Sequence, residues 1–400
     1  MKKTVLALAI AATSVCAGAA QADVKVGFLG GFTGGIESLT PPIFDGAKLA
    51  MQEVNDQGGL LDGEKMTMPS GDTTCSDASA ASNAADRLVN SEQVTAIVGA
   101  LCTGATIAAA NNAAIPGGVV MVSPASTAPA VTDLDDNDLV FRTVPSDAFQ
   151  GEQLAKLLIS KGIEDVAVTY VNNDYGQGLD GAFTKTFEAE GGTVSANLAH
   201  EDNRADYRSE IGQLSASGSQ ALVVLAYADT SGQTILRQAY ESGAFTQFIG
   251  ADGMVGNSLV DAIGADVLEG MIATRPGSPD VPGSGIFNDL AEKAGIDPSA
   301  VFAAQSYDAA FLLALAIEKN GSADREGLSE ALRDVATAPG ETILPGEWEK
   351  AKQLIKEGKE INYEGASGSA EFDDNGDVPG IVVEMAVEDG QFVTKGPVGE

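Results

Sequence analysis

Short apolar runs alternate along the chain with longer segments in which apolar residues recur every three or four positions. The apolar runs predict strands at 24–29, 95–98, 119–122, 166–171, 221–226, 248–250 and 271–273. The periodic segments predict helices at 147–160, 179–190, 231–242 and 306–318, and one more that begins at Pro41 and stops at Gly58. Strands that alternate with helices of this length form βαβ units, so we predict an α/β fold with parallel sheets covered on both faces.

The number of strands and the length of 400 residues indicate two domains. Residues 142–147 look like a crossing from one sheet into a second. The chain has no low-complexity linker and no short repeat. We therefore expect two lobes joined by ordered strands rather than by a flexible tether.

The first 22 residues have the pattern of a secretory signal. Lys2 and Lys3 precede an apolar stretch at 5–12, and small residues end in Ala20-Gln21-Ala22. This stretch is too short to span a membrane and stay there, and no second run reaches that length. We expect cleavage after Ala22 and a mature protein that lies free outside the inner membrane, in the periplasm.

Loss of the signal leaves two cysteines, Cys75 and Cys102, in an exported chain where thiols oxidise. We predict a disulfide between them. A metal or redox site is a weak alternative, because the pair is far from C-x-x-C spacing and His200 is the only histidine.

The charge and composition exclude several classes of protein. A formal net charge of −34 argues against binding to nucleic acid, which needs clustered Lys and Arg. The hydrophobic content of 44% and a mean hydropathy of +0.04 indicate a folded chain rather than a disordered one.

Each segment that resembles an enzymatic or cofactor-binding motif lacks a residue or a spacing that the motif requires. The glycine-rich segment 27–35 lacks G-x-G-x-x-G spacing and is followed by no P-loop lysine. Residues 373–377 resemble the start of a calcium loop, but Val382 stands where a bidentate Glu is needed, and 133–138 reads as a solvated loop. His200 is expected in a surface turn, without a G-x-S-x-G elbow. We predict no enzyme, no metal and no cofactor.

Two apolar strands each end in a turn with hydroxyl side chains. One runs into Cys102-Thr103-Gly104, and the other runs into Ser123-Pro124-Ala125-Ser126-Thr127. If each turn opens a helix, two helix N-termini with Thr hydroxyls could hold one carboxylate, although a capping role alone would explain either turn. Ligands of α/β folds bind at such strand ends. Other polar candidates in similar positions are Tyr175, Tyr227, Asp252 and Tyr307.

Several segments resemble the type I periplasmic solute-binding proteins, and among them the leucine/isoleucine/valine-binding proteins of ABC transporters. The resemblance covers 24–334 and resumes near 372. Its most specific segments are the cysteine pair, Phe44-Asp45-Gly46-Ala47, 123–127, Tyr175-Gly176-Gln177-Gly178, Leu236-Arg237-Gln238-Ala239 and Glu269-Gly270-Met271.

The resemblance implies two Rossmann-like lobes with three hinge crossovers, which close on a ligand between them. The crossings would lie near Val144, Ala273 and Pro379. The first lobe would then comprise 23–144 and 274–379, and the second 145–273 and 380–400.

The resemblance also implies roles for individual residues. Thr103 and Thr127 would hold the α-carboxylate of an amino acid. The carbonyl of Ala125 and the carboxylate of Asp252 would receive its ammonium group. Tyr175, Tyr227 and Tyr307 match aromatic pocket positions, and Leu39 stands where the family has a pocket Trp. Asp252 replaces a Glu and reaches about 1.5 Å less far.

The leading hypothesis is therefore a monomeric receptor for a branched-chain or other aliphatic amino acid, which it delivers to an ABC permease. One alternative keeps the fold but binds a carboxylate or amide without an ammonium group. Another is a ligand sensor that docks on a signalling receptor. Segment 346–369 has no counterpart in shorter family members, and its Trp348, Ala351, Leu354 and Ile355 predict one amphipathic helix followed by a polar loop.

Overall fold

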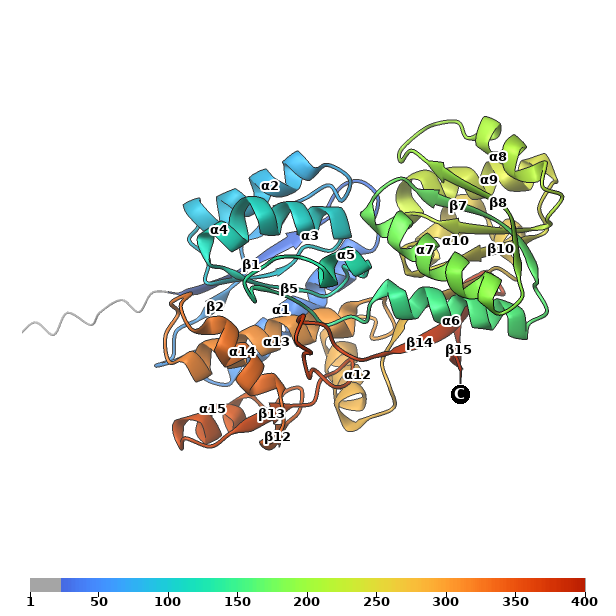
Figure 1. Cartoon of the computed structure of the whole chain (residues 1–400). Coiled ribbons are helices and arrows are strands. Elements are labelled where there is room, and N and C mark those ends of the chain that lie inside the picture. Colours follow the sequence, from blue (N-terminus) through green and yellow to red (C-terminus); the bar gives the residue numbers. More distant parts are fainter. Residues whose placement is uncertain (1–22, 400) are drawn as a thin grey trace, which may run out of the picture.

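Two lobes lie side by side in the computed structural model, which describes residues 23–399 (Figure 1). Each lobe has a central sheet with helices on both faces, which confirms the predicted α/β fold. The expected secretory signal, 1–22, falls outside the described residues. Within 23–399, no helix has the combination of length and apolar character needed to cross a membrane.

The first lobe is built on a parallel sheet with the order β2-β1-β4-β5-β6, and β3 also pairs with β1. β4 and β5 are buried along their whole length, as is usual for strands with helices on both faces. Its strands are β1(Val24–Gly30), β2(Met66–Thr67), β3(Ser70–Asp72), β4(Ala96–Gly99), β5(Val120–Ser123) and β6(Val140–Arg142). Its helices are α1(Thr40–Asp56), α2(Ala78–Asp86), α3(Thr103–Ala109), α4(Ile115–Gly117), α5(Pro129–Thr132), α12(Pro282–Ala294), α13(Ala303–Asn320) and α14(Leu328–Ala336).

The second lobe has a sheet with the order β15-β14-β11-β10-β9-β7-β8. Its first five strands in sequence are parallel, whereas β14 and β15 form an antiparallel hairpin at one edge. Its strands are β7(Asp165–Val171), β8(Thr193–His200), β9(Ala221–Leu225), β10(Gln247–Gly250), β11(Ile272–Gly277), β14(Ile381–Glu388) and β15(Gln391–Pro397). The tight turn at Asp389 and Gly390, both with positive φ, reverses the chain from β14 into β15.

Helices on the two faces of this sheet form separate cores. α6(Asp147–Ser160) and α7(Asp174–Ala189) cover one face, and α8(Arg208–Ser215), α9(Gln233–Ser242) and α10(Asn257–Ile263) cover the other, with α11(Ala265–Leu268) following. The predicted bounds of α6 agree with the structure, because the side chain of Ser146 caps the helix at its first turn.

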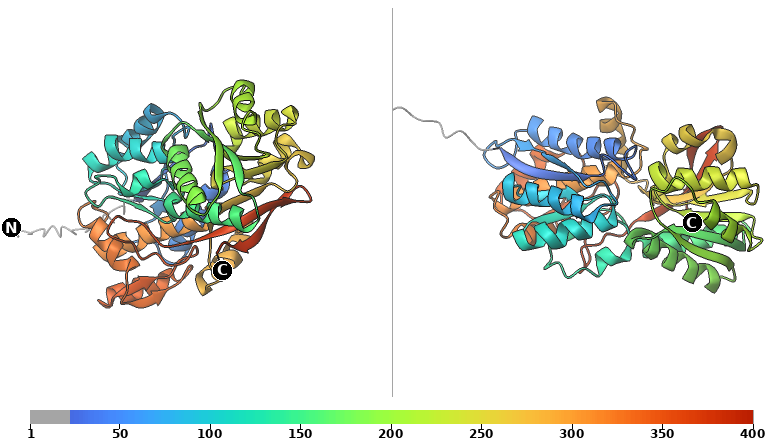
Figure 2. Two further views of the ribbon diagram at one scale, coloured as in Figure 1. Left: turned by 45° about the vertical axis from the view of Figure 1, so that its right-hand side comes forward. Right: turned by 90° about the horizontal axis from the view of Figure 1, so that it is seen from above.

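Three segments of the chain cross between the lobes, and the view from above shows the lobes joined by them (Figure 2). They run from β6 to α6, from β11 to α12, and into β14. β11 stays in the second sheet as far as Gly277, which pairs with Ile381. The second crossing therefore lies beyond Gly277, a few residues later than the predicted position at Ala273.

The extra segment near the C-terminus folds against the first lobe (Figure 1, lower left). It contains β12(Glu341–Ile343), the predicted helix as α15(Trp348–Lys356), and β13(Ile361–Tyr363), which pairs with β12. The expected polar loop thus includes a strand, because Ile361 and Tyr363 are buried. Trp348 is fully buried and donates from Nε1 to the carbonyl of Gly59 at 3.1 Å.

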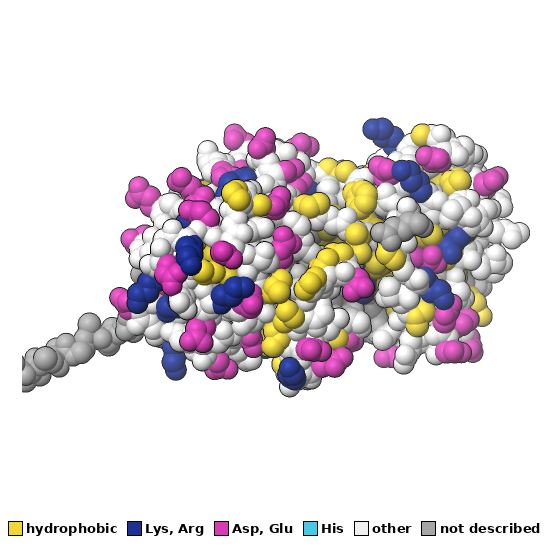
Figure 3. All heavy atoms as spheres, turned by 90° about the horizontal axis from the view of Figure 1, so that it is seen from below, with side chains coloured by type: hydrophobic (Ala, Val, Ile, Leu, Met, Phe, Trp, Pro, Cys, Tyr) yellow, Lys and Arg dark blue, Asp and Glu magenta, His cyan; other side chains and the backbone are white. Residues whose placement is uncertain are grey.

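Acidic side chains are spread over both lobes, whereas hydrophobic side chains gather along the junction between the lobes on the face seen from below (Figure 3). The junction is therefore the least polar part of this face.

Candidate ligand-binding site

A cavity with about 360 Å³ of space, part of which is open to solvent, lies between the lobes. Five of its lining residues each follow a parallel strand: Thr103 after β4, Ala125 after β5, Tyr175 after β7, Tyr227 after β9 and Asp252 after β10. The cavity therefore lies where the carboxyl ends of the two sheets face each other. The remaining lining residues are Ile36, Leu39, Ile43, Leu101, Cys102, Gly253 and Phe302.

The first hydroxyl turn has the predicted form. Cys102 is extended, and Thr103 begins α3. Cys102 is bonded to Cys75 with a Cα–Cα distance of 5.3 Å, which confirms the predicted disulfide and anchors this turn. The Thr103 hydroxyl accepts only a long hydrogen bond of 3.4 Å from the Ala128 amide. Its hydroxyl and the free amides of the first helical turn are thus available to an anion.

The second hydroxyl turn differs from the prediction. No helix opens directly at Thr127, since the chain stays extended before Pro129 and α5 spans only Pro129–Thr132. Ser123 instead braces the turn, donating to the Ala100 carbonyl at 2.6 Å and accepting from the Ser126 amide at 3.0 Å. The expected pair of helix N-termini is therefore reduced to one.

Thr127 is not among the residues that line the cavity. Its hydroxyl is buried without a hydrogen-bond partner, and its carbonyl accepts from the amide of Asp147 at 2.7 Å. Thr127 therefore brings the second hydroxyl turn next to the start of α6.

A buried arginine holds this turn in place. Arg142 forms two 2.6 Å hydrogen bonds to the carboxylate of Asp377, which lies in the segment leading to β14. Its Nη1 also donates to the carbonyls of Thr127 at 2.8 Å and Ala128 at 3.0 Å. Arg142 thus ties the turn to two of the interlobe crossings.

The second lobe contributes two stacked tyrosines. The rings of Tyr175 and Tyr227 lie 5.3 Å apart at an interplanar angle of 17°. The Tyr227 hydroxyl accepts from Asn173 at 3.3 Å, and its ring packs on Gly35 of the first lobe. A Cβ at Gly35 would lie 3.1 Å from this ring, so a glycine lets the lobes approach closely here.

Asp252 lies at the same end of the cavity as these tyrosines. Its Oδ1 accepts from Gln150 at 2.9 Å and from the Tyr175 hydroxyl at 3.1 Å. Burial raises the pKa of Asp252 to about 6, while the hydrogen bonds from Tyr175 and Gln150 oppose that rise.

Asp147 is a second buried carboxylate beside Asp252, and the sequence did not reveal it. It begins α6, and no regular hydrogen bond reaches its carboxylate, although the Thr127 hydroxyl is close enough to lower its pKa. Burial, followed by the charge of Asp252, raises the pKa of Asp147 well above its usual range, against the opposing effects of Thr127 and Arg142. Two adjacent buried carboxylates favour a cation as their partner.

Tyr307 is not brought to the cavity. It lies in the core of the first lobe, where it stacks on Phe311 with ring centroids 5.7 Å apart and its hydroxyl accepts from the Gly346 amide at 2.9 Å. The residue before α13, Phe302, lines the cavity instead, because the start of this helix points at the cleft and Tyr307 lies one turn deeper.

Three contacts hold the lobes together beside the cavity. The amide of Ser38 donates to the carboxylate of Asp229 at 2.7 Å, and the hydroxyls of Ser38 and Ser258 lie 2.8 Å apart. The amide of Asp229 also donates to the carbonyl of Gly35 at 3.2 Å. The structure therefore has the lobes closed on the cavity.

A family described as "Periplasmic binding protein" matches residues 23–353. The chain belongs to this family. This chain is 31% identical over 312 residues to the leucine-, isoleucine-, valine-, threonine- and alanine-binding protein of Pseudomonas aeruginosa. The match covers 78% of this chain and 82% of that relative.

Solved structures share the fold. The leucine-binding protein LivK of Thermotoga maritima superposes with a TM-score of 0.79 at 28% identity, covering 94% of this chain and 98% of that one. A solute-binding protein of an ABC transporter from R. palustris, in complex with benzoate, gives a TM-score of 0.76 at 18% identity, covering 94% and 96% of the two chains. At that identity the similarity is one of fold alone.

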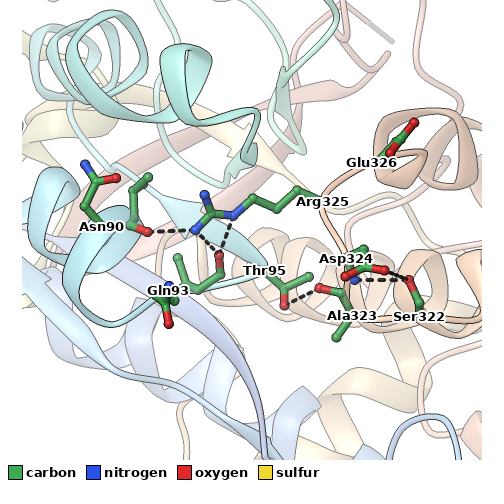
Figure 4. A pocket seen from close by; sticks show the side chains of 10 residues that line it. Asn90, Gln93, Thr95, Ser322, Ala323, Asp324, Arg325 and Glu326 are labelled. Atoms are coloured by element: carbon green, nitrogen blue, oxygen red, sulfur yellow. Dashed lines mark hydrogen bonds between the residues drawn. The ribbon is translucent and has the colours of Figure 1, made fainter.

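A larger surface hollow on the first lobe of this periplasmic binding protein has a structural role (Figure 4). Arg325 reaches across it and donates to the carbonyls of Val89, Val94 and Gly117 at 2.7 to 3.1 Å. These acceptors occupy the guanidinium group, which fastens the loop after α13 to the segments that precede β4 and β5.

The structure corrects the predicted position of His200. It is the last residue of β8 and is buried, with Thr169 Oγ1 at 2.8 Å from Nδ1 and Ser231 Oγ at 3.1 Å from Nε2. Burial lowers its pKa to about 4, so the ring is neutral at physiological pH. Among residues 23–399, no group of His, Cys, Asp and Glu side chains has the arrangement of a metal site.

Proposed function

We propose that this periplasmic binding protein is the substrate-binding component of an ABC importer and that it binds a small aliphatic amino acid, branched-chain ones included, between its lobes. The observation that carries the proposal is the pairing of opposite chemistry in one cavity. Hydroxyl and amide donors lie at Thr103 on the first-lobe wall of the cavity, and the buried carboxylate of Asp252 lies on the second-lobe wall, with Asp147 beside it.

A zwitterion would satisfy both walls. Its carboxylate would take hydrogen bonds from the Thr103 hydroxyl and the first amides of α3, where the helix dipole favours an anion. Its ammonium would face Asp252, Asp147 and the carbonyl of Ala125. Burial of either charge without such partners would cost several kcal/mol, so only a ligand with both groups uses the site fully.

The apolar lining of the cavity supports an aliphatic side chain. Apolar side chains of Ile36, Leu39, Ile43 and Phe302 line it. Leu39 stands where the leucine/isoleucine/valine-binding proteins have a Trp by resemblance, and it gives the ligand a smaller and non-aromatic contact.

The alternative is a carboxylate without an ammonium group, of the kind bound by the benzoate complex that shares this fold. Asp252 and Asp147 disfavour it, because a bare anion would be repelled by two neighbouring carboxylates.

Family membership supports a periplasmic location and delivery to an inner-membrane permease. The sequence pattern supports export with cleavage after Ala22.

Isothermal titration of the mature chain against the common amino acids and benzoate tests the proposal. We expect micromolar or tighter binding of at least one aliphatic amino acid. Absence of amino-acid binding would refute the proposal, and benzoate binding that Asp252→Asn leaves intact or improves would establish the alternative.

A further inference from the structure

A second hollow lies next to the amino-acid cavity, on the other side of Leu39. It has about 1060 Å³ of space, part of which is open to solvent, and Leu39 lines both hollows. The first lobe contributes the start of α1 and residues 297–301, and the second contributes 255–258 and strands β14 and β15. We refer to this hollow as the hinge groove, because Arg275 of the crossing strand β11 lies on its wall.

The guanidinium group of Arg275 is poorly compensated. Its contacts are the Ser299 carbonyl at 3.2 Å, the Pro276 carbonyl at 3.4 Å and the thioether of Met385 at 3.4 Å. A guanidinium has five N–H donors, and these are long bonds to weak or neutral acceptors. Among residues 23–399, no carboxylate forms an ion pair with it.

Although the chain has 57 acidic and 23 basic residues, Arg275 has no ion-pair partner among residues 23–399, and unlike Arg325 it has no short hydrogen bonds to carbonyls in place of one. The buried Arg142 pairs with Asp377, and Arg325 has short bonds to carbonyls. Burial lowers the pKa of Arg275 to about 10, with the charge of Asp297 opposing, so the group remains charged at neutral pH. Its unused donors lie on the wall of a hollow large enough for a small molecule.

The rest of the groove defines the ligand. Val255, Val301 and Phe392 offer apolar surface near the charged group. Asp297 also lines the groove, so a second negative charge on the ligand would be repelled. We propose that the hinge groove is a second binding site, separate from the amino-acid cavity, for a small organic monocarboxylate whose carboxylate pairs with Arg275 and whose apolar tail packs on Phe392.

Both lobes contribute to this groove, so its occupant would bridge them. A molecule that contacts both lobes only when they are closed stabilises the closed form. It therefore strengthens the binding of the amino acid in the adjacent cavity, and by linkage the amino acid strengthens the binding of this molecule by the same factor.

Titration calorimetry with sodium hexanoate on the mature chain tests the proposal, because hexanoate has one carboxylate and an apolar tail. We expect millimolar or tighter binding that Arg275→Gln weakens about 10-fold or more, as expected for loss of a charge-assisted hydrogen bond. Hexylamine, with the opposite charge, should not bind. Thr103→Val, which alters the amino-acid cavity, should leave hexanoate binding unchanged.

The proposal is overturned if hexanoate fails to bind at millimolar concentrations, or if Arg275→Gln binds it as well as the parent chain. It is also overturned if Thr103→Val abolishes binding, since hexanoate would then occupy the amino-acid cavity. If circular dichroism shows that Arg275→Gln does not fold, Phe392→Ala provides the test instead. We expect this variant to bind hexanoate more weakly than the parent chain, and unchanged binding would contradict the proposal.

Discussion

Replacement of Asp252 by Asn tests two effects of its buried charge separately. One is the loss of folding stability that the charge causes, and the other is its contribution to amino-acid binding. In the ligand-free chain, burial raises the pKa of this carboxyl from its ordinary 3.8 to about 6. A tenfold change in an acid dissociation constant corresponds to about 1.4 kcal/mol, so at neutral pH the carboxylate costs the folded chain about 3 kcal/mol.

The sign of this effect follows from the direction of the pKa change. The pKa of Asp252 is higher in the folded than in the unfolded chain, so the cost is absent at low pH and grows as pH rises from about 4 to about 6. The Asn side chain can still accept from Gln150 and Tyr175. At neutral pH we therefore expect Asp252→Asn to raise the free energy of unfolding of the ligand-free protein by up to about 3 kcal/mol.

The same substitution should weaken amino-acid binding. Loss of a buried partner for an ammonium group costs about 2 to 4 kcal/mol, or about 30- to 1000-fold in Kd. Urea unfolding measures the first effect and titration calorimetry the second. Asp180→Asn is a matched control, because Asp180 is also largely buried but pairs with Asn197 away from the cavity.

A variant that is both more stable without ligand and weaker in binding is the expected result. The reasoning is refuted if Asp252→Asn binds the amino acid as tightly as the parent chain does, or if the ligand-free variant is less stable than the parent.

Four further outcomes follow from the same geometry. Asp147→Asn should weaken amino-acid binding at least 10-fold in calorimetry, because the buried Asp147 beside Asp252 would be a second partner of the ligand's ammonium group; unchanged affinity would remove Asp147 from the site. Binding should weaken as pH falls below about 6, by up to about tenfold per pH unit as Asp252 takes up a proton, and a flat profile from about pH 8 to about pH 5 would contradict this. Replacing Cys75 and Cys102 by Ser should lower the free energy of unfolding by about 3 kcal/mol, and a reductant should then have no further effect in thermal unfolding. Asp229→Ala should raise the amino-acid Kd about 10-fold by loss of the bond to the Ser38 amide of the first lobe; an unaltered dissociation rate in stopped-flow would argue against a role in closure.

The sequence was most informative where a buried strand ends in a turn. Parallel strands bring their carboxyl ends to one edge of a sheet, so Thr103, Tyr175, Tyr227 and Asp252 could be found before the fold was known, and all four line the cavity. Ala125, which the resemblance supplied, lines it as well, whereas Thr127 and Tyr307 do not.

Other parts of the site carry no local signal. Acidic residues are common in the first turn of a helix, because a negative charge there interacts favourably with the helix dipole. Asp147 in the first turn of α6 therefore gives no sign in the sequence of a binding role. The pair of Arg142 and Asp377 joins residues 235 positions apart, a separation that no local pattern reveals. The apolar wall residue Phe302 looks like any core residue in the sequence.

Two differences arise from tertiary packing. Tyr307 follows the start of α13 by one turn, which directs its ring into the lobe core rather than the cleft. β8 is an edge strand with alternating partly buried and exposed residues, so its sequence resembles a surface segment. His200 at its end is nevertheless covered by Ser231.

Displacement of a radiolabelled amino acid by its deaminated analogue tests the central claim most directly. The competitor is the carboxylic acid that lacks only the ammonium group of the tightest-binding amino acid, such as 4-methylpentanoate for leucine. If Asp147 and Asp252 are the partners of that ammonium group, we predict that a hundredfold excess of the competitor over the labelled amino acid displaces none of it. A hundredfold difference in Kd corresponds to about 3 kcal/mol of binding free energy. Displacement at a concentration similar to that of the unlabelled amino acid would contradict the account.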